Sequence, residues 1–233
     1  MALKEFTGYS AVGLQFLVDL KENNNKEWFD ANRSIYEKEL REVSKALISE
    51  LGRRFTSAGL PYIADIKRSM FRINRDIRFS NNKDPYKTNI GMFFPFDING
   101  LFDKKTKSLG LYFHLEPGSH LAGAGIVMPD NDTLLNIRQG IAANSEEFLS
   151  VVEGGLFKKE FPEEHIASTP LKNVPRGFEK GSPAEYYLKK KDHSYFSFID
   201  ENEVLKPELP EYIEYKAAAA LPFLGLLDSF ING

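Results

Sequence analysis

The sequence predicts an α+β fold, in which a central antiparallel sheet is packed by an N-terminal helical hairpin and C-terminal helices. Apolar residues recur at steps of three or four over residues 10–58 and again after residue 130. Between these blocks, residues 62–128 contain short apolar runs separated by turn residues. The first pattern is typical of helices and the second of strands, and closely spaced strands pair antiparallel.

The N-terminal block predicts two helices. Residues 10–22 suit a short helix that ends at a run of three asparagines, and residues 24–58 suit a longer one. Asn24 with Glu27 three residues later resembles a capping box, and Gly59 can end the second helix. Each helix has one apolar face, so we expect the two to pack as a hairpin.

The middle block predicts strands joined by short turns such as Pro117-Gly118. The expected strands cover residues 62–66, 71–79, 90–96, 109–116 and 121–128. We expect them to form one antiparallel sheet that the two N-terminal helices cover on one face.

The C-terminal block returns mainly to helix. We expect helices over residues 132–143, 145–153, 182–191 and 210–230, with a kink at Pro222, and a late strand over residues 195–199. No repeat and no linker rich in Pro, Gly or Ser interrupts the chain. The prediction is one domain over residues 1–233, with the hairpin at about 10–58, the sheet at about 62–128 and the helical part at about 130–233.

Composition limits the classes of protein to consider. With 233 residues, 42% of them hydrophobic, the chain can bury a sizeable core. Cysteine is absent, which excludes disulfides, thiolate metal sites and a cysteine nucleophile, and agrees with a reducing compartment. The most apolar run, residues 217–227, contains Pro222 and falls short of the roughly 20 residues of a membrane span. The start lacks the apolar core of a signal peptide. We therefore predict a cytoplasmic protein that does not contact membranes.

Positive charge is concentrated in one short segment. Residues 67–87 carry seven basic and two acidic side chains, a net charge of +5, whereas the whole chain carries −3. The basic residues are Lys67, Arg68, Arg72, Arg75, Arg78, Lys83 and Lys87. A local cationic cluster on an acidic protein indicates one bound anion or internal ion pairs rather than a surface that holds nucleic acid along its length.

Alternation along the predicted strand divides this cluster between two faces. Arg72, Asp76 and Arg78 fall on one face, and Arg75 shares the other with apolar side chains. A helix would instead spread the apolar residues around its circumference, so we favour the strand. Residues 81–85 are typical of a turn, which would return Lys83, Tyr86 and Lys87 toward the strand.

The same segment carries a resemblance. From Arg72 to Tyr86 the chain reads Arg-x-x-Arg-Asp-x-Arg-Phe-x-x-x-Lys-x-x-Tyr, which is similar to the signature of the family called domain of unknown function 2461. Members of this uncharacterised family occur in bacteria and within longer fungal proteins. Residues 23–29, 123–125 and 171–178 resemble the family as well, so the likeness spans most of the chain. It implies no reaction, cofactor or catalytic residue.

Other candidate chemistry is weaker. His114, Glu116 and His120 could be drawn as a metal site, and Tyr112 shares the strand face of the first two. The spacing matches no established metal motif, and polar residues alternating with apolar ones are typical of a half-exposed strand. Residues 123–125 read Gly-Ala-Gly but lack the rest of a dinucleotide fingerprint and favour a bulge or close backbone approach. We predict no metal and no cofactor.

Two functions and one structural alternative fit the basic cluster. In the first, an enzyme clamps a phosphorylated or carboxylate small molecule between Arg72 and Arg78, and Lys83, Lys87 and the Tyr86 side chain complete the site. Its acid–base residue would be Asp76 or Tyr86, and the catalytic residue itself is unassigned. In the second, the same cations form a non-catalytic module for a phosphate-bearing partner such as a nucleotide or a nucleic-acid end.

The structural alternative needs no ligand. Asp76 would bridge Arg72 and Arg78 in a network that fastens the strand to a helix. Arg75, on the apolar face, would need a carboxylate partner if buried, so we expect it to form a structural ion pair. The sequence leaves the oligomeric state open.

Overall fold

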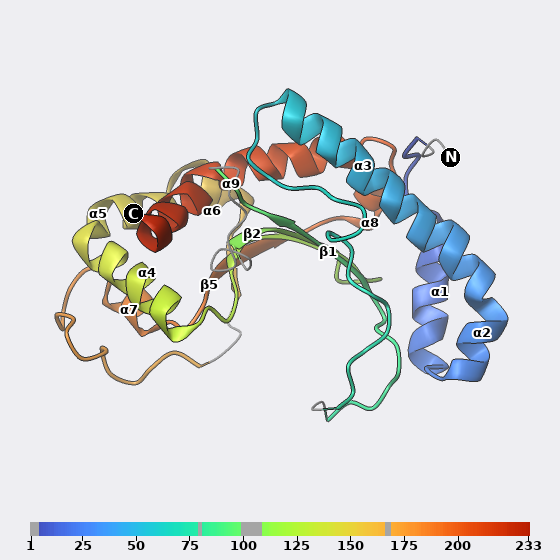
Figure 1. Cartoon of the computed structure of the whole chain (residues 1–233), viewed down its shortest axis with the longest axis horizontal. Coiled ribbons are helices and arrows are strands. Elements are labelled where there is room, and N and C mark those ends of the chain that lie inside the picture. The colour runs from blue at the N-terminus through green and yellow to red at the C-terminus, as the bar shows by residue number, and fades with distance from the viewer. Residues whose placement is uncertain (1–4, 79–80, 99–108, 166–168) are drawn as a thin grey trace. The chain divides into compact units, whose positions relative to one another are not determined.

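The computed structural model describes residues 5–78, 81–98, 109–165 and 169–233. It confirms the α+β fold: a five-stranded antiparallel sheet is accompanied by helices from both ends of the chain (Figure 1). The helices are α1 (Ala11–Glu22), α2 (Lys26–Ile35), the π-helix η1 (Tyr36–Arg41), α3 (Glu42–Ser57), α4 (Asn131–Ala143), α5 (Ser145–Val152), α6 (Gly155–Glu160), α7 (Glu185–Lys189), α8 (Glu201–Val204) and α9 (Leu209–Asn232).

The strands are β1 (Ile90–Pro95), β2 (Leu109–Leu115), β3 (Leu121–Ile126), β4 (Glu163–His165) and β5 (His193–Phe198), and their order in the sheet is β1-β2-β3-β5-β4. The late strand predicted near residue 195 is β5, which pairs with β4 in the register Glu164↔Tyr195. The sequence did not predict β4, α6 or α8. The described residues fall into two compact units. Unit 1 comprises Met1–Phe94, Tyr112–Ala122 and Phe198–Glu214, and unit 2 comprises Pro95–Leu111, Gly123–Ser197 and Tyr215–Gly233. The single domain stays a prediction.

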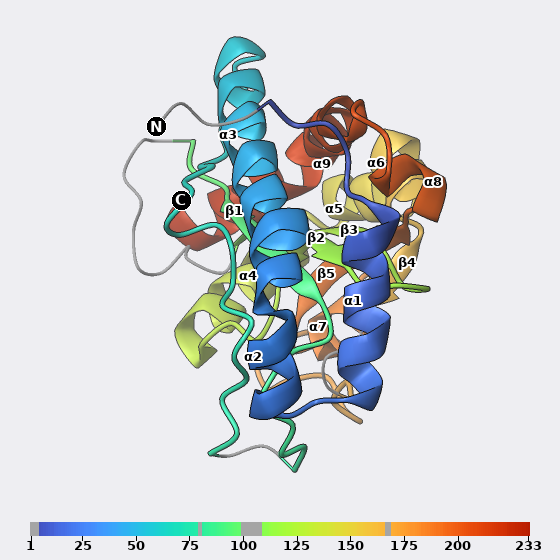
Figure 2. The same ribbon diagram turned by 90° about the vertical axis from the view of Figure 1, so that its right-hand side faces the viewer.

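The N-terminal helices of unit 1 form the expected hairpin (Figure 2). Ser10 caps α1 by accepting a hydrogen bond from the Gly13 backbone N–H. The second predicted helix is continuous from α2 through η1 to α3, and it ends at Ser57, after which Gly59 adopts φ +65°. The prediction of Asn24 as its cap is wrong. Asn25 accepts the hydrogen bond from the Trp28 N–H at 2.9 Å, because Asn24 has another partner.

Asn24 holds the chain before β1. Its side-chain amide donates to the Tyr86 carbonyl oxygen and accepts from the Tyr86 N–H, both at 3.0 Å. The Tyr86 ring stacks on Phe29 of α2 with centroids 4.0 Å apart. One backbone position is therefore fixed through both of its polar groups and its ring.

The core of unit 1 lies between the helical hairpin and one face of β1 and β2. Phe55 of α3 packs edge-on against Phe94, and Tyr9 stacks on Phe113. Leu111, Phe113 and Leu115 are completely buried, whereas the alternate side chains of β2 are only half-buried. The expected alternation of β2 is thus present, and its second face carries the polar residues.

Two predicted strands are wrong. Residues 62–66 lead into a turn, because the Asp65 carbonyl accepts from the N–H groups of Arg68 and Ser69 and its carboxylate accepts from the Lys67 N–H. Residues 71–78 are not a sheet strand either, and Phe79 lies outside the described residues. Asp76 accepts a hydrogen bond from the Arg78 N–H, and a local bond of this kind competes with strand pairing.

Unit 2 has its own aromatic core. Phe157 of α6 stacks on Phe223 of α9, and Tyr195 of β5 meets both rings edge-on. Gly125 of β3 has φ +133°, and a Cβ there would collide with the His193 carbonyl oxygen. This is the close backbone approach that the glycines of residues 123–125 indicated. Helix α9 contains Pro222 within its length, and α7 is shorter than predicted.

Among the helices of the described residues, none is both long enough and apolar enough to span a bilayer.

Removing the Asn24 amide should destabilise unit 1. Asn24→Ala removes the acceptor of the part-buried Tyr86 N–H and leaves the Tyr86 carbonyl only its long 3.4 Å contact with Arg75, so we expect the free energy of unfolding to fall by about 1 to 3 kcal/mol in urea titrations. Asn23→Ala is the matched control. It removes an exposed amide that bonds only within α1 and should cost less than about 0.5 kcal/mol. Equal losses in the two variants would show that Asn24 does not hold the segment.

Candidate functional site

The basic segment forms an arm that leaves the sheet and returns to it. At its base, the Phe71 N–H donates to the Gly91 carbonyl of β1 at 2.9 Å. Farther out, the Arg75 N–H donates to the Pro85 carbonyl and the Lys87 N–H donates to the Ile73 carbonyl. Figure 1 shows residues 71–78 running out and residues 81–87 running back in unit 1. We call residues 71–78 and 81–87 the arm.

Arg78 and Lys83, two of the predicted anion-binding residues, form hydrogen bonds within the arm, and Arg72 makes a longer contact there. Arg78 binds the Asp76 carboxylate through two guanidinium nitrogens at 2.9 and 2.7 Å, and Arg72 lies 3.9 Å from the same carboxylate. The hydrogen bonds from Arg78 hold the pKa of Asp76 below its usual range, which makes it a weak base. The Lys83 ammonium donates to the Ile77 carbonyl at 3.0 Å.

The other cations meet at the base of the arm. Lys87 lies over the Phe71 ring at 5.3 Å, and its pKa is lowered first by burial and then by the charges of Arg72 and Arg75. Arg75 donates to the Tyr86 carbonyl at 3.4 Å, and its buried Nε has no partner. No carboxylate of the described residues pairs with Arg75 or Lys87, so the ion pair expected for Arg75 is not found there. We call Arg72, Arg75 and Lys87 the cationic site.

Tyr86, a predicted acid–base candidate, belongs to the core. Its ring is only 6% exposed and stacks on Phe29. Adjacent side chains of an extended segment point to opposite sides, so Tyr86 and Lys87 diverge. The side of the arm that carries Lys87 is the one that faces Phe71.

A chain of hydrogen bonds runs along the half-buried face of β2. The Tyr112 hydroxyl lies 2.9 Å from Nδ1 of His114, and Nε2 of His114 lies 3.0 Å from a carboxylate oxygen of Glu116. Thr88 donates to the other Glu116 oxygen at 3.2 Å. We call Tyr112, His114 and Glu116 the relay. The sequence placed these three residues on one face, but it gave no sign of Thr88, which reaches Glu116 from a bend before β1.

When the His114 imidazole is neutral, the relay has one consistent proton arrangement. A Glu116 carboxylate can only accept, so the Nε2–H of His114 donates to it and Nδ1 becomes the acceptor. The Tyr112 hydroxyl then donates to Nδ1. Burial first, and then the charge of Glu116, raises the pKa of Tyr112 to about 12, which keeps the phenol neutral near pH 7.

Phe71 connects the cationic site with the relay. Its ring lies under the Lys87 ammonium and 6.2 Å from the Tyr112 ring, centroid to centroid. A Cβ at Gly91 would stand 2.8 Å from the Tyr112 hydroxyl and 3.0 Å from the Phe71 ring. The glycine therefore makes the space in which this hydroxyl and Phe71 lie together on β1.

The metal site considered from the sequence has little geometric support. Both ring nitrogens of His114 have hydrogen-bond partners, and His120 is 2% exposed with its Nε2 3.7 Å from Glu201. The pKa of His120 is lowered, and the largest cause is burial of the ring. Within the described part of the chain, no three His, Asp or Glu side chains are arranged to hold a metal ion.

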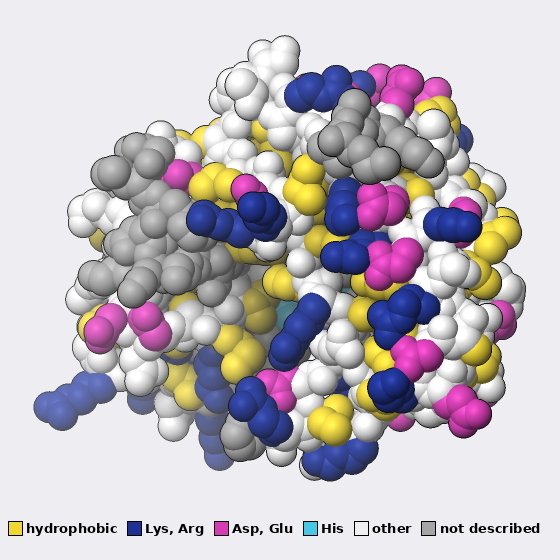
Figure 3. All heavy atoms as spheres, turned by 45° about the vertical axis from the view of Figure 1, so that its right-hand side comes forward, with side chains coloured by type: hydrophobic (Ala, Val, Ile, Leu, Met, Phe, Trp, Pro, Cys, Tyr) yellow, Lys and Arg dark blue, Asp and Glu magenta, His cyan; other side chains and the backbone are white. Residues whose placement is uncertain are grey.

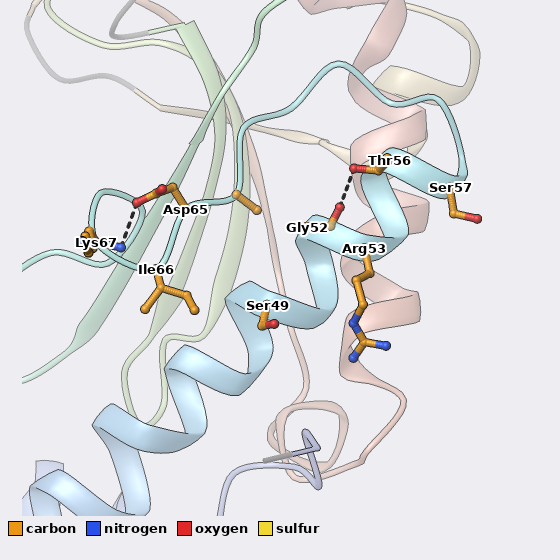
Figure 4. Close-up of a pocket in the computed structure, with 9 residues that line it drawn as sticks. Ser49, Gly52, Arg53, Thr56, Ser57, Asp65, Ile66 and Lys67 are labelled. Carbon is orange, nitrogen blue, oxygen red and sulfur yellow. Dashed lines mark hydrogen bonds between the residues drawn. The ribbon is translucent and has the colours of Figure 1, made fainter. Parts of the chain in front are cut away.

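An open groove of about 790 Å³ lies elsewhere in unit 1, between α3 and residues 64–67 (Figure 4). Several of its polar groups already have local partners. Thr56 donates to the Gly52 carbonyl, and the Asp65 carboxylate accepts from the Lys67 N–H. The groove therefore offers less binding chemistry than the cationic site.

The surface view shows no continuous basic track. Lys and Arg side chains alternate with Asp and Glu over much of the visible face (Figure 3). The exposed lysines and arginines of α2 and α3 have carboxylate neighbours one helical turn away, such as Lys26 with Asp30.

Comparison with known proteins gives a family and nothing more specific. A family model described as conserved hypothetical protein (DUF2461) matches residues 13–225. No curated protein and no solved structure matches the chain.

Neutralising Lys87 should stabilise the protein when no anion is present. The pKa of Lys87 is lowered by folding, so its charge opposes the folded state at every pH below this pKa, and the penalty disappears above the unfolded value of about 10.4. We expect Lys87→Met to raise the melting temperature at pH 7 in Tris chloride. Lys38→Met, at an exposed position of η1, is the control and should change it little. A lower melting temperature for Lys87→Met alone would contradict this account.

Proposed function

Because the chain belongs to the DUF2461 family, whose description names no activity, we propose a function from the geometry: an enzyme that binds a small phosphorylated or carboxylate molecule at the cationic site. The finding that carries the proposal is that the charge of Lys87 has no carboxylate partner among the described residues. Lys87 is half-buried beside Arg72 and Arg75. A bound anion would supply the missing negative charge.

The chemistry of the three cations suits such a ligand. Arg72 has a largely exposed guanidinium, and its contact with Asp76 is long at 3.9 Å, so its planar fork can turn toward a phosphate or carboxylate. Arg75 has a buried N–H group at Nε that lacks an acceptor. Lys87 adds a point charge at the same place. Arg78 and Lys83 already donate to Asp76 and to the Ile77 carbonyl, which leaves fewer of their N–H groups for a ligand.

The relay favours an enzyme over a non-catalytic module. A module for a phosphate-bearing partner needs only the cations, whereas a tyrosine, a histidine and a glutamate in hydrogen-bonded order can also move a proton. The structural alternative explains Asp76 with Arg78. It does not explain the cationic site, because a scaffold gains nothing from placing a half-buried lysine beside two like charges.

Other parts of the proposal concern partners and location. We expect any nucleic-acid binding to be weak and confined to ends or nucleotides, because a chain of net charge −3 offers no extended cationic track that would release counterions from a duplex. The absence of cysteine fits a cytoplasmic protein.

Phosphate should stabilise the wild-type protein through the cationic site. A ligand that binds only the folded state raises the melting temperature as its concentration exceeds its Kd. We expect inorganic phosphate to do so more strongly than acetate if the ligand is a phosphate ester, and the reverse order for a carboxylate. Arg72→Ala and Lys87→Met should lose the stabilisation, and Lys38→Met should keep it.

Chloride at matched ionic strength separates binding from screening. If neither anion stabilises the wild type beyond chloride, or if Lys87→Met responds as fully as the wild type, the proposed anion site is wrong. Binding to a long duplex at sub-micromolar concentration and physiological salt would overturn the expectation for nucleic acid.

A further inference from the structure

We infer that the relay is the acid–base machinery of this site and that the Tyr112 hydroxyl is the group that takes a proton from the bound molecule. The inference rests on the proposed function, because it assumes an anion at the cationic site. It names a reaction class, which is proton abstraction from a small phosphorylated or carboxylate substrate that carries an acidic O–H or C–H beside its anionic group.

The hydrogen bonds define the path of the proton. The Tyr112 oxygen has a free lone pair, while its own hydrogen points at Nδ1 of His114. When the substrate's X–H bond breaks, its proton binds the Tyr112 oxygen as the phenolic hydrogen passes to Nδ1. Tyr112 stays neutral, His114 becomes an imidazolium, and the electron pair of the X–H bond remains on the substrate. The substrate atom loses one bond to hydrogen, the Tyr112 oxygen exchanges one for another and Nδ1 gains one, so the step balances without an oxidant or a metal.

Each new charge has an opposite charge beside it. The imidazolium keeps its Nε2–H on the Glu116 carboxylate, 3.0 Å away, and Thr88 fixes the other carboxylate oxygen. The negative charge left on the substrate faces the cationic site. His120 is a further titratable group that interacts with His114, and it adds little repulsion because it is buried with a lowered pKa. Glu116 and Thr88 are positioning residues, because they act through His114.

Two features place Tyr112 for this role rather than for packing. First, Gly91 leaves the space beside the phenolic oxygen that any side chain would fill. Glycine inside a strand is unfavourable unless another group must approach closely, and here that group is the Tyr112 hydroxyl. Second, Phe71 touches both ends of the site, because it carries Lys87 over its ring and lies beside Tyr112.

The test follows Tyr112 and His114 by NMR while phosphate is added. Protein labelled with ¹³Cζ-tyrosine and ¹⁵N-imidazole is titrated with inorganic phosphate, and signals are assigned with Tyr112→Phe and His114→Gln. We expect His114 to be the Nε2–H tautomer without ligand. Phosphate should move the Tyr112 ¹³Cζ and His114 Nδ1 signals, with the same midpoint as the rise in melting temperature.

Variants separate the relay from the anion site. Tyr112→Phe should keep the phosphate-dependent rise in melting temperature but move the Nδ1 signal to that of an unbonded acceptor. Glu116→Gln should mix the two tautomers of His114, which a merely structural glutamate would not do. Tyr215→Phe is the control, because it removes a tyrosine–glutamate bond in unit 2 and should leave His114 unchanged.

The two proposals fail in different ways. If phosphate raises the melting temperature through Lys87 and neither the Tyr112 nor the His114 signal moves, the anion site stands and the relay is not part of it. If His114 is the Nδ1–H tautomer, the proton path is wrong whatever phosphate does. If phosphate changes neither stability nor any signal, the proposed function fails and the relay assignment fails with it.

Discussion

The pairing of the Asn24 amide with the backbone of Tyr86 is the contact on which the candidate site depends. A side-chain amide here replaces a neighbouring strand, because it satisfies both the N–H and the carbonyl of one residue. The Tyr86 ring also stacks on Phe29, so both the backbone and the side chain are held in one orientation at this point. Lys87 must then lie on the other side of the chain, where Phe71 and the two arginines are. The connection between two helices thus sets the direction of a charge far along the sequence.

A second constraint aligns the arm with the sheet. After Lys87 the chain bends at residues 88–89 and enters β1, which brings Thr88 to Glu116. Strict alternation on β2 places Tyr112, His114 and Glu116 in one row, while the intervening residues are buried under the helices. The relay is therefore ordered by the same pleat that builds the core. Gly91 keeps β1 from blocking the Tyr112 end of this row.

The sequence predicted the regular parts of this arrangement and missed the irregular ones. Helix periodicity gave the hairpin, and alternation gave β1, β2 and β3 and the shared face of Tyr112 and His114. The same alternation wrongly predicted a strand over residues 71–79. A period of two does not reveal that the Asp76 carboxylate accepts a hydrogen bond from the Arg78 N–H. Three consecutive asparagines look alike as caps, so the role of Asn24 could not be read from them. The predicted set Arg72, Arg78, Lys83 and Lys87 named the right segment, but only coordinates distinguish the cations already engaged within the arm from those of the cationic site.

The energetics of the site argue for a ligand rather than for a scaffold. Stable folds pair or expose their charges, and the Arg78 guanidinium is both paired with Asp76 and exposed. Because the pair is exposed, it contributes little to stability. Lys87 is neither, because burial and two like charges both disfavour its protonated form. Groups held in such a state cluster where a protein uses them, since the cost is recovered when an opposite charge arrives. Under the proposed function, a bound phosphate or carboxylate would neutralise these cations, because it supplies the negative charge that no carboxylate of the described residues supplies to Lys87.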